Sequence, residues 1–183
     1  MNRRQILLSA LGLPLLARTA AAQDAAGLAP ALMPQEVTVD PAVLPGQIFV
    51  IPDDFHLYHI LTPGRAMRYG VAVGAEGRDF KGEAIIERKE EWPSWRPTDE
   101  MIARDPERYE QYADGMPGGP DNPLGARALY LYEDGVDTYY RIHGTNDPSS
   151  IGRSVSNGCI RMRNEDAIEL FDRVMLGTPV TVF

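Results

Sequence analysis

The stretch ALYLYEDGVDTYYRIHG, residues 128–144, carries the clearest fold signal in this 183-residue chain. Two runs rich in aromatic and β-branched residues flank the dipeptide Asp134-Gly135. An Asp-Gly pair between two such runs is typical of a tight β-hairpin. The sequence therefore predicts a hairpin whose second strand ends at His143.

More strand signals lie on both sides of this hairpin. Residues 48–61, IFVIPDDFHLYHIL, place a Pro-Asp-Asp turn between two β-rich runs, and RAMRYGVAVG at 65–74 adds a third. EAIIERK at 83–89 is another candidate strand, and TPVTVF at 178–183 predicts a last short strand that could close the sheet. Strands therefore dominate the expected fold.

Helical signals are fewer. Between residues 97 and 112, Thr98 and Asp105 are suitable N-caps and Pro106 suits a first helical position. We expect one or two short helices there.

RNEDAIELFDRVMLGTP, residues 163–179, predicts a single helix capped by Asn164 and ended by Gly177 and Pro179. Acidic residues follow the expected cap, where the helix dipole favours them. The apolar face of this helix would be formed by Ala167, Leu170, Phe171 and Val174.

The N-terminus has the pattern of an export signal. MNRRQ is followed by an apolar run over residues 6–16 and by Ala20–Ala22 before Gln23. This predicts a signal peptide over residues 1–22 and an exported, periplasmic protein, with Arg3-Arg4 compatible with a Sec or a twin-arginine route. The alternative is an uncleaved anchor, although the apolar run is much shorter than the roughly 20 residues that span a bilayer.

The remaining chain is long enough for one domain with a real core. We assign residues 23–45 to a leader, of which 23–36 is small-residue, Pro-containing and expected to be disordered, and residues 46–183 to the domain. Loss of the three signal-peptide arginines changes the formal charge from −8 to −11. Such acidity argues against nucleic acid or an anionic membrane surface as a partner.

Cys159 is the only cysteine in the chain. Exported proteins usually pair their cysteines, so an unpaired one indicates intermolecular pairing or a free thiol that could act as a nucleophile. A buried structural cysteine is the alternative, but Ser156, Asn157, Gly158 and Arg161 are polar or flexible neighbours. We therefore interpret Cys159 as a candidate nucleophile.

A nucleophilic thiol needs a nearby base or cation, because its usual pKa of roughly 8.5 leaves it mostly protonated. His143, at the end of the predicted hairpin, is the histidine of the same segment, fifteen residues of loop away. Backbone N–H groups of the turn at 157–159 are candidates for stabilising an oxyanion. The residues alone thus predict a thiol acting on an amide.

The motif running from IHGT to SIGRSVSNGCIRM, residues 142–162, strongly resembles the active-site motif of the L,D-transpeptidase catalytic domains, the YkuD-like family. The resemblance covers most of residues 46–183. It implies a mainly β fold with short helices, of β-sandwich or barrel-like form, with one helix after the cysteine loop. It implies no cofactor.

By this resemblance, Cys159 is the acylated nucleophile and His143 is its base and later acid. Gly144 would offer its carbonyl to orient the imidazole. Arg161 would fix the loop or meet a substrate carboxylate.

The same resemblance has Ser156, Asn157 and Gly158 shape the oxyanion site. The family often has His where this chain has Asn157, which removes any role that needs a second imidazole. The segment DFKGEAII, residues 79–86, also replaces a Pro-Thr-Pro-x-Gly turn of many members, so that wall of the cleft is expected to differ.

The resemblance implies a cell-wall enzyme that organises peptidoglycan and cell shape. Its thiolate would attack the third-residue carbonyl of a tetrapeptide stem, expel the terminal D-alanine and pass the acyl group to an amine. The amine could belong to a second stem or to a lysine of an outer-membrane protein. Hydrolysis by the same residues, as a carboxypeptidase or endopeptidase, and a non-catalytic wall-binding module are the alternatives.

Two other residue pairs are conspicuous. His56 and His59 would point to opposite faces of a strand, so we expect no metal site. Trp92 and Trp95 could line a substrate groove or pack against the strands, and the sequence leaves both options open.

Overall fold

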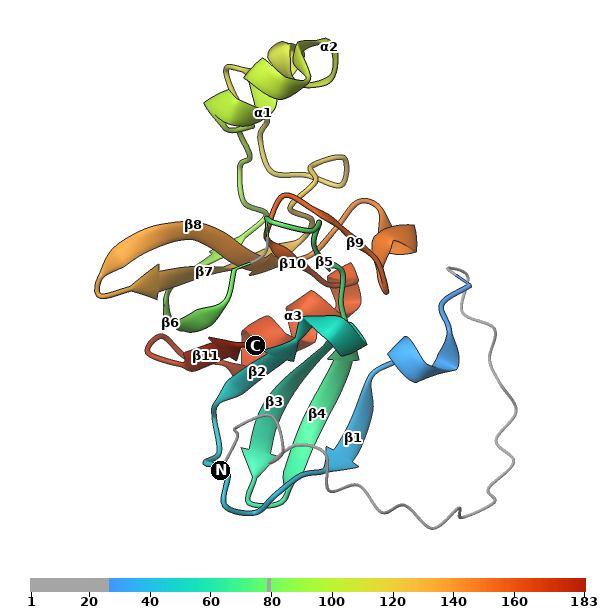
Figure 1. Cartoon of the computed structure of the whole chain (residues 1–183), viewed down its shortest axis with the longest axis vertical. Helices are drawn as coiled ribbons and strands as arrows, with labels where there is room; N and C mark the ends of the chain where they lie inside the picture. The colour runs from blue at the N-terminus through green and yellow to red at the C-terminus, as the bar shows by residue number, and fades with distance from the viewer. Residues whose placement is uncertain (1–26, 79) are drawn as a thin grey trace.

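The structure, a computed structural model, describes residues 27–78 and 80–183. The predicted signal peptide lies outside the described residues. Figure 1 shows a curved sheet, a helix α3 (Asn164–Arg173) packed on it, and an arm with helices α1 (Asp99–Arg104) and α2 (Pro106–Tyr109) that projects from one end. The mainly β fold with short helices is therefore confirmed.

The main sheet has nine strands in the order β1-β4-β3-β2-β11-β6-β7-β8-β10. Pairs β2–β11 and β8–β10 are parallel, and the other neighbours are antiparallel. A separate parallel pair joins β5 to β9. The bounds are β1 Gln35–Thr38, β2 Ile48–Ile51, β3 His56–Thr62, β4 Arg65–Gly70, β5 Val73–Gly74, β6 Gly82–Glu91, β7 Arg127–Glu133, β8 Val136–His143, β9 Ser154–Ser156, β10 Ile160–Arg161 and β11 Pro179–Val182.

The hairpin predicted around Asp134-Gly135 is formed by β7 and β8. Both turn residues have positive φ, 51° and 76°, which is the conformation that an Asp-Gly pair tolerates in a two-residue turn. Glu133 pairs directly with Val136 across it. The local sequence therefore fixes this turn.

The predicted C-terminal strand is also present, as β11. It lies in the middle of the sheet, parallel to β2 and antiparallel to β6. Val180 and Val182 are buried in the core. This strand joins the two halves of the sheet.

The two short helices of the arm begin where the sequence predicts. The Thr98 side chain accepts a hydrogen bond from the Met101 N–H at 3.2 Å, and Asp105 accepts one from the Arg108 N–H at 3.3 Å. Each cap satisfies an amide that the first helical turn leaves free. Four single-turn 3₁₀ helices complete the described elements: η2 Pro30–Leu32, η3 Pro52–Asp54, η4 Glu110–Tyr112 and η5 Pro148–Ser150.

Helix α3 is present, but it ends at Arg173, before the predicted stop at Gly177, and its predicted cap was wrong. The N-cap residue is Arg163, and no side chain caps the helix. Asn164 instead directs its Oδ1 away from the helix and accepts hydrogen bonds from the N–H groups of Ala126 and Thr145, at 3.0 and 3.1 Å. Tertiary hydrogen bonds therefore outweigh the local capping preference.

Part of the predicted leader also belongs to the fold. Residues 35–38 form β1, which pairs with β4 at the edge of the sheet, and Val39 and Val43 are buried. The prediction of a leader up to residue 45 was therefore wrong for this part. A short polar strand is stabilised here by the free N–H and C=O groups of the β4 edge, which a hydropathy pattern does not reveal.

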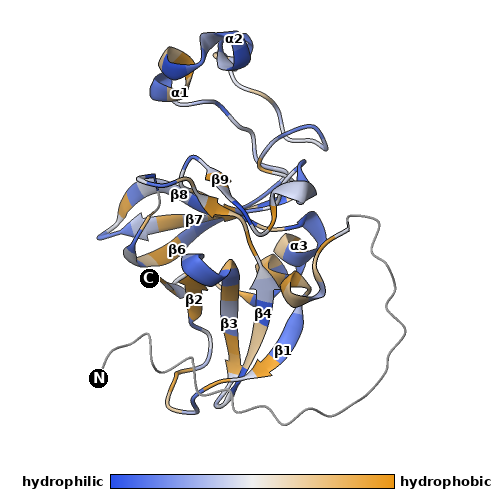
Figure 2. Cartoon of the chain, turned by 45° about the vertical axis from the view of Figure 1, so that its right-hand side comes forward, coloured by the Kyte–Doolittle hydropathy of each residue, from blue (hydrophilic) through white to orange (hydrophobic). Residues whose placement is uncertain are grey.

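The main core lies between the sheet and α3. Figure 2 shows apolar residues along the strands and on α3. Buried members of this core include Ile48, Leu57, Tyr69, Ile86, Leu131, Ile142, Met162, Ala167, Leu170 and Val180.

None of the helices in the described part of the chain is long and apolar enough to cross a bilayer.

Leu170→Ala should lower the free energy of unfolding by about 3 kcal/mol, because Leu170 is fully buried in this core and its removal leaves a cavity. Urea denaturation followed by circular dichroism measures the change. The control is Leu176→Ala, which truncates a leucine that is 61% exposed and should cost less than about 0.5 kcal/mol. Equal losses for the two variants would contradict this account of the core.

Candidate active site

The parallel pairing of β8 with β10 brings His143 and Cys159 together. Arg161 lies opposite His143 and Ile160 lies opposite Ile142. Residues two apart on a strand point to the same face, so Cys159, just before β10, lies on the face that carries His143. Both residues line one pocket of about 530 Å³.

The imidazole of His143 is buried, with the residue 4% exposed. Its Nδ1 lies 2.6 Å from the carbonyl oxygen of Gly144, the contact that the family resemblance implies. Because the oxygen can only accept, Nδ1 carries the proton and Nε2 is the basic nitrogen of the neutral ring. Burial, followed by the charge of Arg161, lowers the pKa of His143 to about 4.

The thiol of Cys159 is also held in its neutral form. Burial raises its pKa, and this effect is opposed by the backbone N–H of Arg141 and by the positive charges of Arg141 and Arg161. The Sγ atom lies 3.9 Å from the carbonyl oxygen of Tyr139, within reach of a weak S–H hydrogen bond. At neutral pH the site therefore rests as a thiol beside an uncharged imidazole.

A bulge in β8 positions the groups around the sulfur. Between the pairs Tyr130–Arg141 and Tyr132–Asp137 the register shifts, and Tyr139 takes a φ of 62°. Backbone conformations of this kind persist only where surrounding contacts enforce them. Local sequence gave no signal for this bulge.

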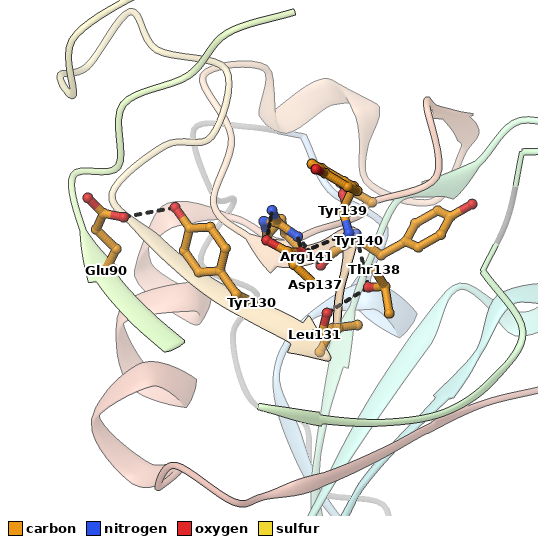
Figure 3. A network of polar contacts seen from close by, with 9 residues as sticks. Glu90, Tyr130, Leu131, Asp137, Thr138, Tyr139, Tyr140 and Arg141 are labelled. Carbon is orange, nitrogen blue, oxygen red and sulfur yellow. Dashed lines mark hydrogen bonds and ion pairs between the residues drawn. The ribbon is translucent and has the colours of Figure 1, made fainter. Parts of the chain in front are cut away.

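Figure 3 shows the contacts that hold the bulge. The Asp137 carboxylate accepts two hydrogen bonds from the Arg141 guanidinium, at 2.7 and 2.9 Å, and a third from the Tyr139 N–H at 2.8 Å. The guanidinium also lies over the ring of Tyr130, whose hydroxyl donates to Glu90. This bidentate pair directs the Tyr139 carbonyl and the Arg141 N–H towards Cys159.

Ser156 closes the turn before the cysteine. Its buried hydroxyl donates to the Cys159 carbonyl at 2.5 Å and accepts from the Gly158 N–H at 3.1 Å. The Gly158 amide is thus engaged within the loop, and the oxyanion role expected for the 157–159 turn stays a prediction. Gly158 itself is required, since φ is 122° and a Cβ would overlap the Tyr140 ring.

Asn157 connects the loop to two distant segments. Its Oδ1 accepts hydrogen bonds from Arg78 Nη1 at 2.9 Å and from Arg104 Nη2, on α1, at 2.7 Å. The predicted oxyanion residue Asn157 is therefore used, through its side chain, to tie the arm to the cysteine loop. The backbone of Arg161 is fixed in turn by paired hydrogen bonds with Ala72, at 2.8 and 2.9 Å.

Asn164 holds the histidine side of the site. Its hydrogen bond to the Thr145 N–H braces the segment directly after Gly144. A Cβ on Gly144 would overlap the Asn164 side chain, so this close approach requires glycine. The sequence pattern predicted Asn164 as a helix cap, but its side chain contacts Ala126 and Thr145, which are distant in sequence.

The arm forms the opposite wall of the pocket. Trp95 packs edge-on against Tyr109 and Tyr112, with ring centroids 6.3 and 5.8 Å apart, and all three line the pocket. Trp92, in contrast, is 45% exposed. Of the two tryptophans that the sequence left open, Trp95 therefore lines the pocket and Trp92 lies exposed at the surface.

The two remaining histidines lie elsewhere. His59 is buried, and the Nε2 of His56 lies 3.0 Å from the Ala31 carbonyl oxygen. Within residues 27–78 and 80–183, no group of three or more His, Cys, Asp or Glu side chains is placed to hold a metal ion.

The pocket thus combines a thiol, a buried imidazole and a turn that requires glycine. The family model described as YkuD, the L,D-transpeptidase catalytic domain, matches residues 45–182. The chain belongs to this family.

Relatives of known name support the assignment. The chain is 35% identical over 153 residues to the "Probable L,D-transpeptidase ErfK/SrfK" of Escherichia coli, covering 82% of this chain and 47% of that protein. It therefore spans about half the length of this curated relative.

Solved structures share the fold. One, from Brucella melitensis and named a probable carnitine operon oxidoreductase, is 51% identical with a TM-score of 0.59, covering 86% of this chain and 98% of that one. The Ldtfm–avibactam carbamoyl enzyme has a TM-score of 0.58 at 20% identity, covering 77% of this chain and 49% of that one. The latter likeness shows the fold alone.

Stability should fall between pH 6.5 and pH 4 because of His143. At pH 7 the imidazole is mostly neutral in the folded and in the unfolded protein. Below pH 6.5 it becomes protonated in the unfolded protein, whereas in the folded protein it stays neutral down to about pH 4. At pH 5 this should cost about 2 kcal/mol. Urea denaturation at pH 7 and pH 5 should show that loss in the wild type relative to His143→Gln, whereas parallel losses in both would contradict a buried neutral imidazole.

Proposed function

We propose that the protein is an exported, periplasmic L,D-transpeptidase that uses Cys159 as its nucleophile. Its substrate is the peptidoglycan tetrapeptide stem, from which the terminal D-alanine is released. The observation that carries the proposal is the β8–β10 pairing, which places Cys159 and His143 in one pocket. Thiol nucleophile and imidazole base are the two groups that acyl transfer from an amide requires.

The resting charges define the first step. Because thiol and imidazole are both neutral, the proton moves from Sγ to Nε2 of His143 as sulfur attacks the third-residue carbonyl. The C–N bond to D-alanine then breaks, and the imidazolium returns the proton to the departing amine. A thioester on Cys159 and a neutral imidazole remain.

The second step reverses the roles. An acceptor amine attacks the thioester while His143 takes a proton from its nitrogen, and the sulfur leaves and regains its proton. A new amide and the free thiol result. The amine is that of a second stem, giving a cross-link, or of a lysine on an outer-membrane protein, giving attachment.

Water is the competing acceptor, and hydrolysis would make the same site a carboxypeptidase or endopeptidase. The aromatic wall of Trp95, Tyr109 and Tyr112 favours transfer, because apolar rings limit water at the pocket. Water is present at about 55 M, whereas an oriented amine can reach effective molarities of about 10⁵ M or more. An amine that is positioned in this pocket would therefore react faster than water.

The direct test is incubation of the mature protein with a donor tetrapeptide, with and without an acceptor amine, followed by mass spectrometry. We expect a ligated product and free D-alanine when the amine is present. Cys159→Ala should lose more than about 10³-fold of the turnover, since it removes the nucleophile. Its unfolding free energy should stay within about 1 kcal/mol of the wild type.

Two outcomes would contradict the proposal. Equal amounts of tripeptide and D-alanine in both incubations, with no ligated product, would make the protein a carboxypeptidase. Turnover retained in Cys159→Ala would remove the thiol from the mechanism.

A further inference from the structure

A second pocket of about 320 Å³ lies beside the thiol pocket. The two pockets are adjacent, because they share lining residues from the arm and from the cysteine loop. A peptide bound at Cys159 would therefore lie next to the second pocket. The shared residues are Arg108, Tyr109, Asp147, Asn157 and Arg161.

This second pocket is lined by an unusual number of arginines. Elsewhere most arginines pair with a carboxylate, as Arg96 does with Asp99 and Arg173 with Glu169. Those of the pocket form no ion pair within residues 27–78 and 80–183. We call them the arginine cluster: Arg78, Arg104, Arg108, Arg153 and Arg161.

The acidic residues of the pocket do not neutralise the cluster. Asp105 caps α2 by accepting from the Arg108 N–H, and Asp147 accepts from the Ser149 hydroxyl at 2.6 Å. Five guanidinium groups against two carboxylates leave a formal excess of three positive charges. The whole chain has a formal charge of −8, so the sign of the charge at this pocket is opposite to that of the chain.

Two members of the cluster are held close together by a neutral group. Arg78 and Arg104 both donate to the same oxygen, Oδ1 of Asn157, at 2.9 and 2.7 Å. An amide oxygen fixes the two guanidinium groups without cancelling their charge. Like charges held in this way repel, and an anion between them would relieve the repulsion.

We propose that the arginine cluster is a binding subsite for carboxylates of the acidic peptide whose amide reaches Cys159. The planar guanidinium fork matches a carboxylate in two parallel hydrogen bonds. The proposal rests on the proposed function in one respect, namely that a peptide occupies the adjoining thiol pocket. A peptide carries its negative charge on carboxylates, which selects them over phosphates.

The subsite would also help an acidic peptide to associate with this acidic protein. An acidic protein repels an acidic substrate, whereas a local positive field beside the thiol raises the concentration of anions where the reaction occurs. Because the cluster is largely exposed, its attraction should weaken as salt screens it.

The test measures binding without turnover. The mature protein is titrated with N-acetyl-Glu-Glu, with the neutral N-acetyl-Gln-Gln amide, and with pyrophosphate, each followed by NMR shifts of backbone amides. We expect saturable binding of the Glu-Glu probe that is centred on the loop around Asn157 and weakens with added salt. The neutral probe should bind at least about fivefold more weakly, and pyrophosphate should bind more weakly than Glu-Glu.

Arg153→Gln is the decisive variant, because no hydrogen bond of its guanidinium holds the described fold together. It should weaken binding of the Glu-Glu probe about two- to fivefold, and the double variant Arg108→Gln/Arg153→Gln more than either single change. Arg173→Gln removes the same charge from a distant pair with Glu169 and should leave the affinity unchanged.

Equal affinity for the charged and neutral probes, or equal losses in Arg153→Gln and Arg173→Gln, would overturn the proposal. Tighter binding of pyrophosphate than of Glu-Glu would overturn the choice of carboxylates. Binding is read independently of the reaction, so a failure of acyl transfer would refute the proposed function while leaving this subsite in place.

Discussion

The parallel register between β8 and β10 is the constraint on which the site depends. It sets Arg161 opposite His143 and thereby places the sulfur of Cys159 on the face that carries the imidazole. Parallel neighbours need a long connection, and here the loop between the two residues supplies it. The Ser156 turn and the hydrogen bond from Thr145 to Asn164 hold the two ends of this loop in place.

Burial sets the chemistry that this register makes available. The same low-polarity surroundings lower the pKa of His143 and raise that of Cys159, so an ion pair is disfavoured at rest. In the proposed mechanism, charge develops only as the substrate is attacked. The Arg141 backbone N–H, held by the ion pair with Asp137, lies where it can stabilise the developing negative charge on sulfur.

The sequence predicted features that are determined locally. The Asp-Gly hairpin and the caps at Thr98 and Asp105 depend on a few adjacent residues and were confirmed. The strand β1, the bulge at Tyr139 and the contacts of Asn164 depend on partners that are distant in sequence, which propensities do not report. For the site, the motif predicted that His143 and Cys159 act together. It did not show that the Gly158 amide donates a hydrogen bond to the Ser156 hydroxyl.

The proposed chemistry depends on a thiol and an imidazole that both rest uncharged in one pocket. The most direct test is the rate constant for alkylation of Cys159 by iodoacetamide, measured by intact mass from pH 5 to pH 10. The rate constant should rise continuously with pH and remain low below pH 8, because only the rare thiolate reacts. A plateau of high rate between pH 5 and pH 7 would indicate a preformed thiolate–imidazolium pair and would contradict the account.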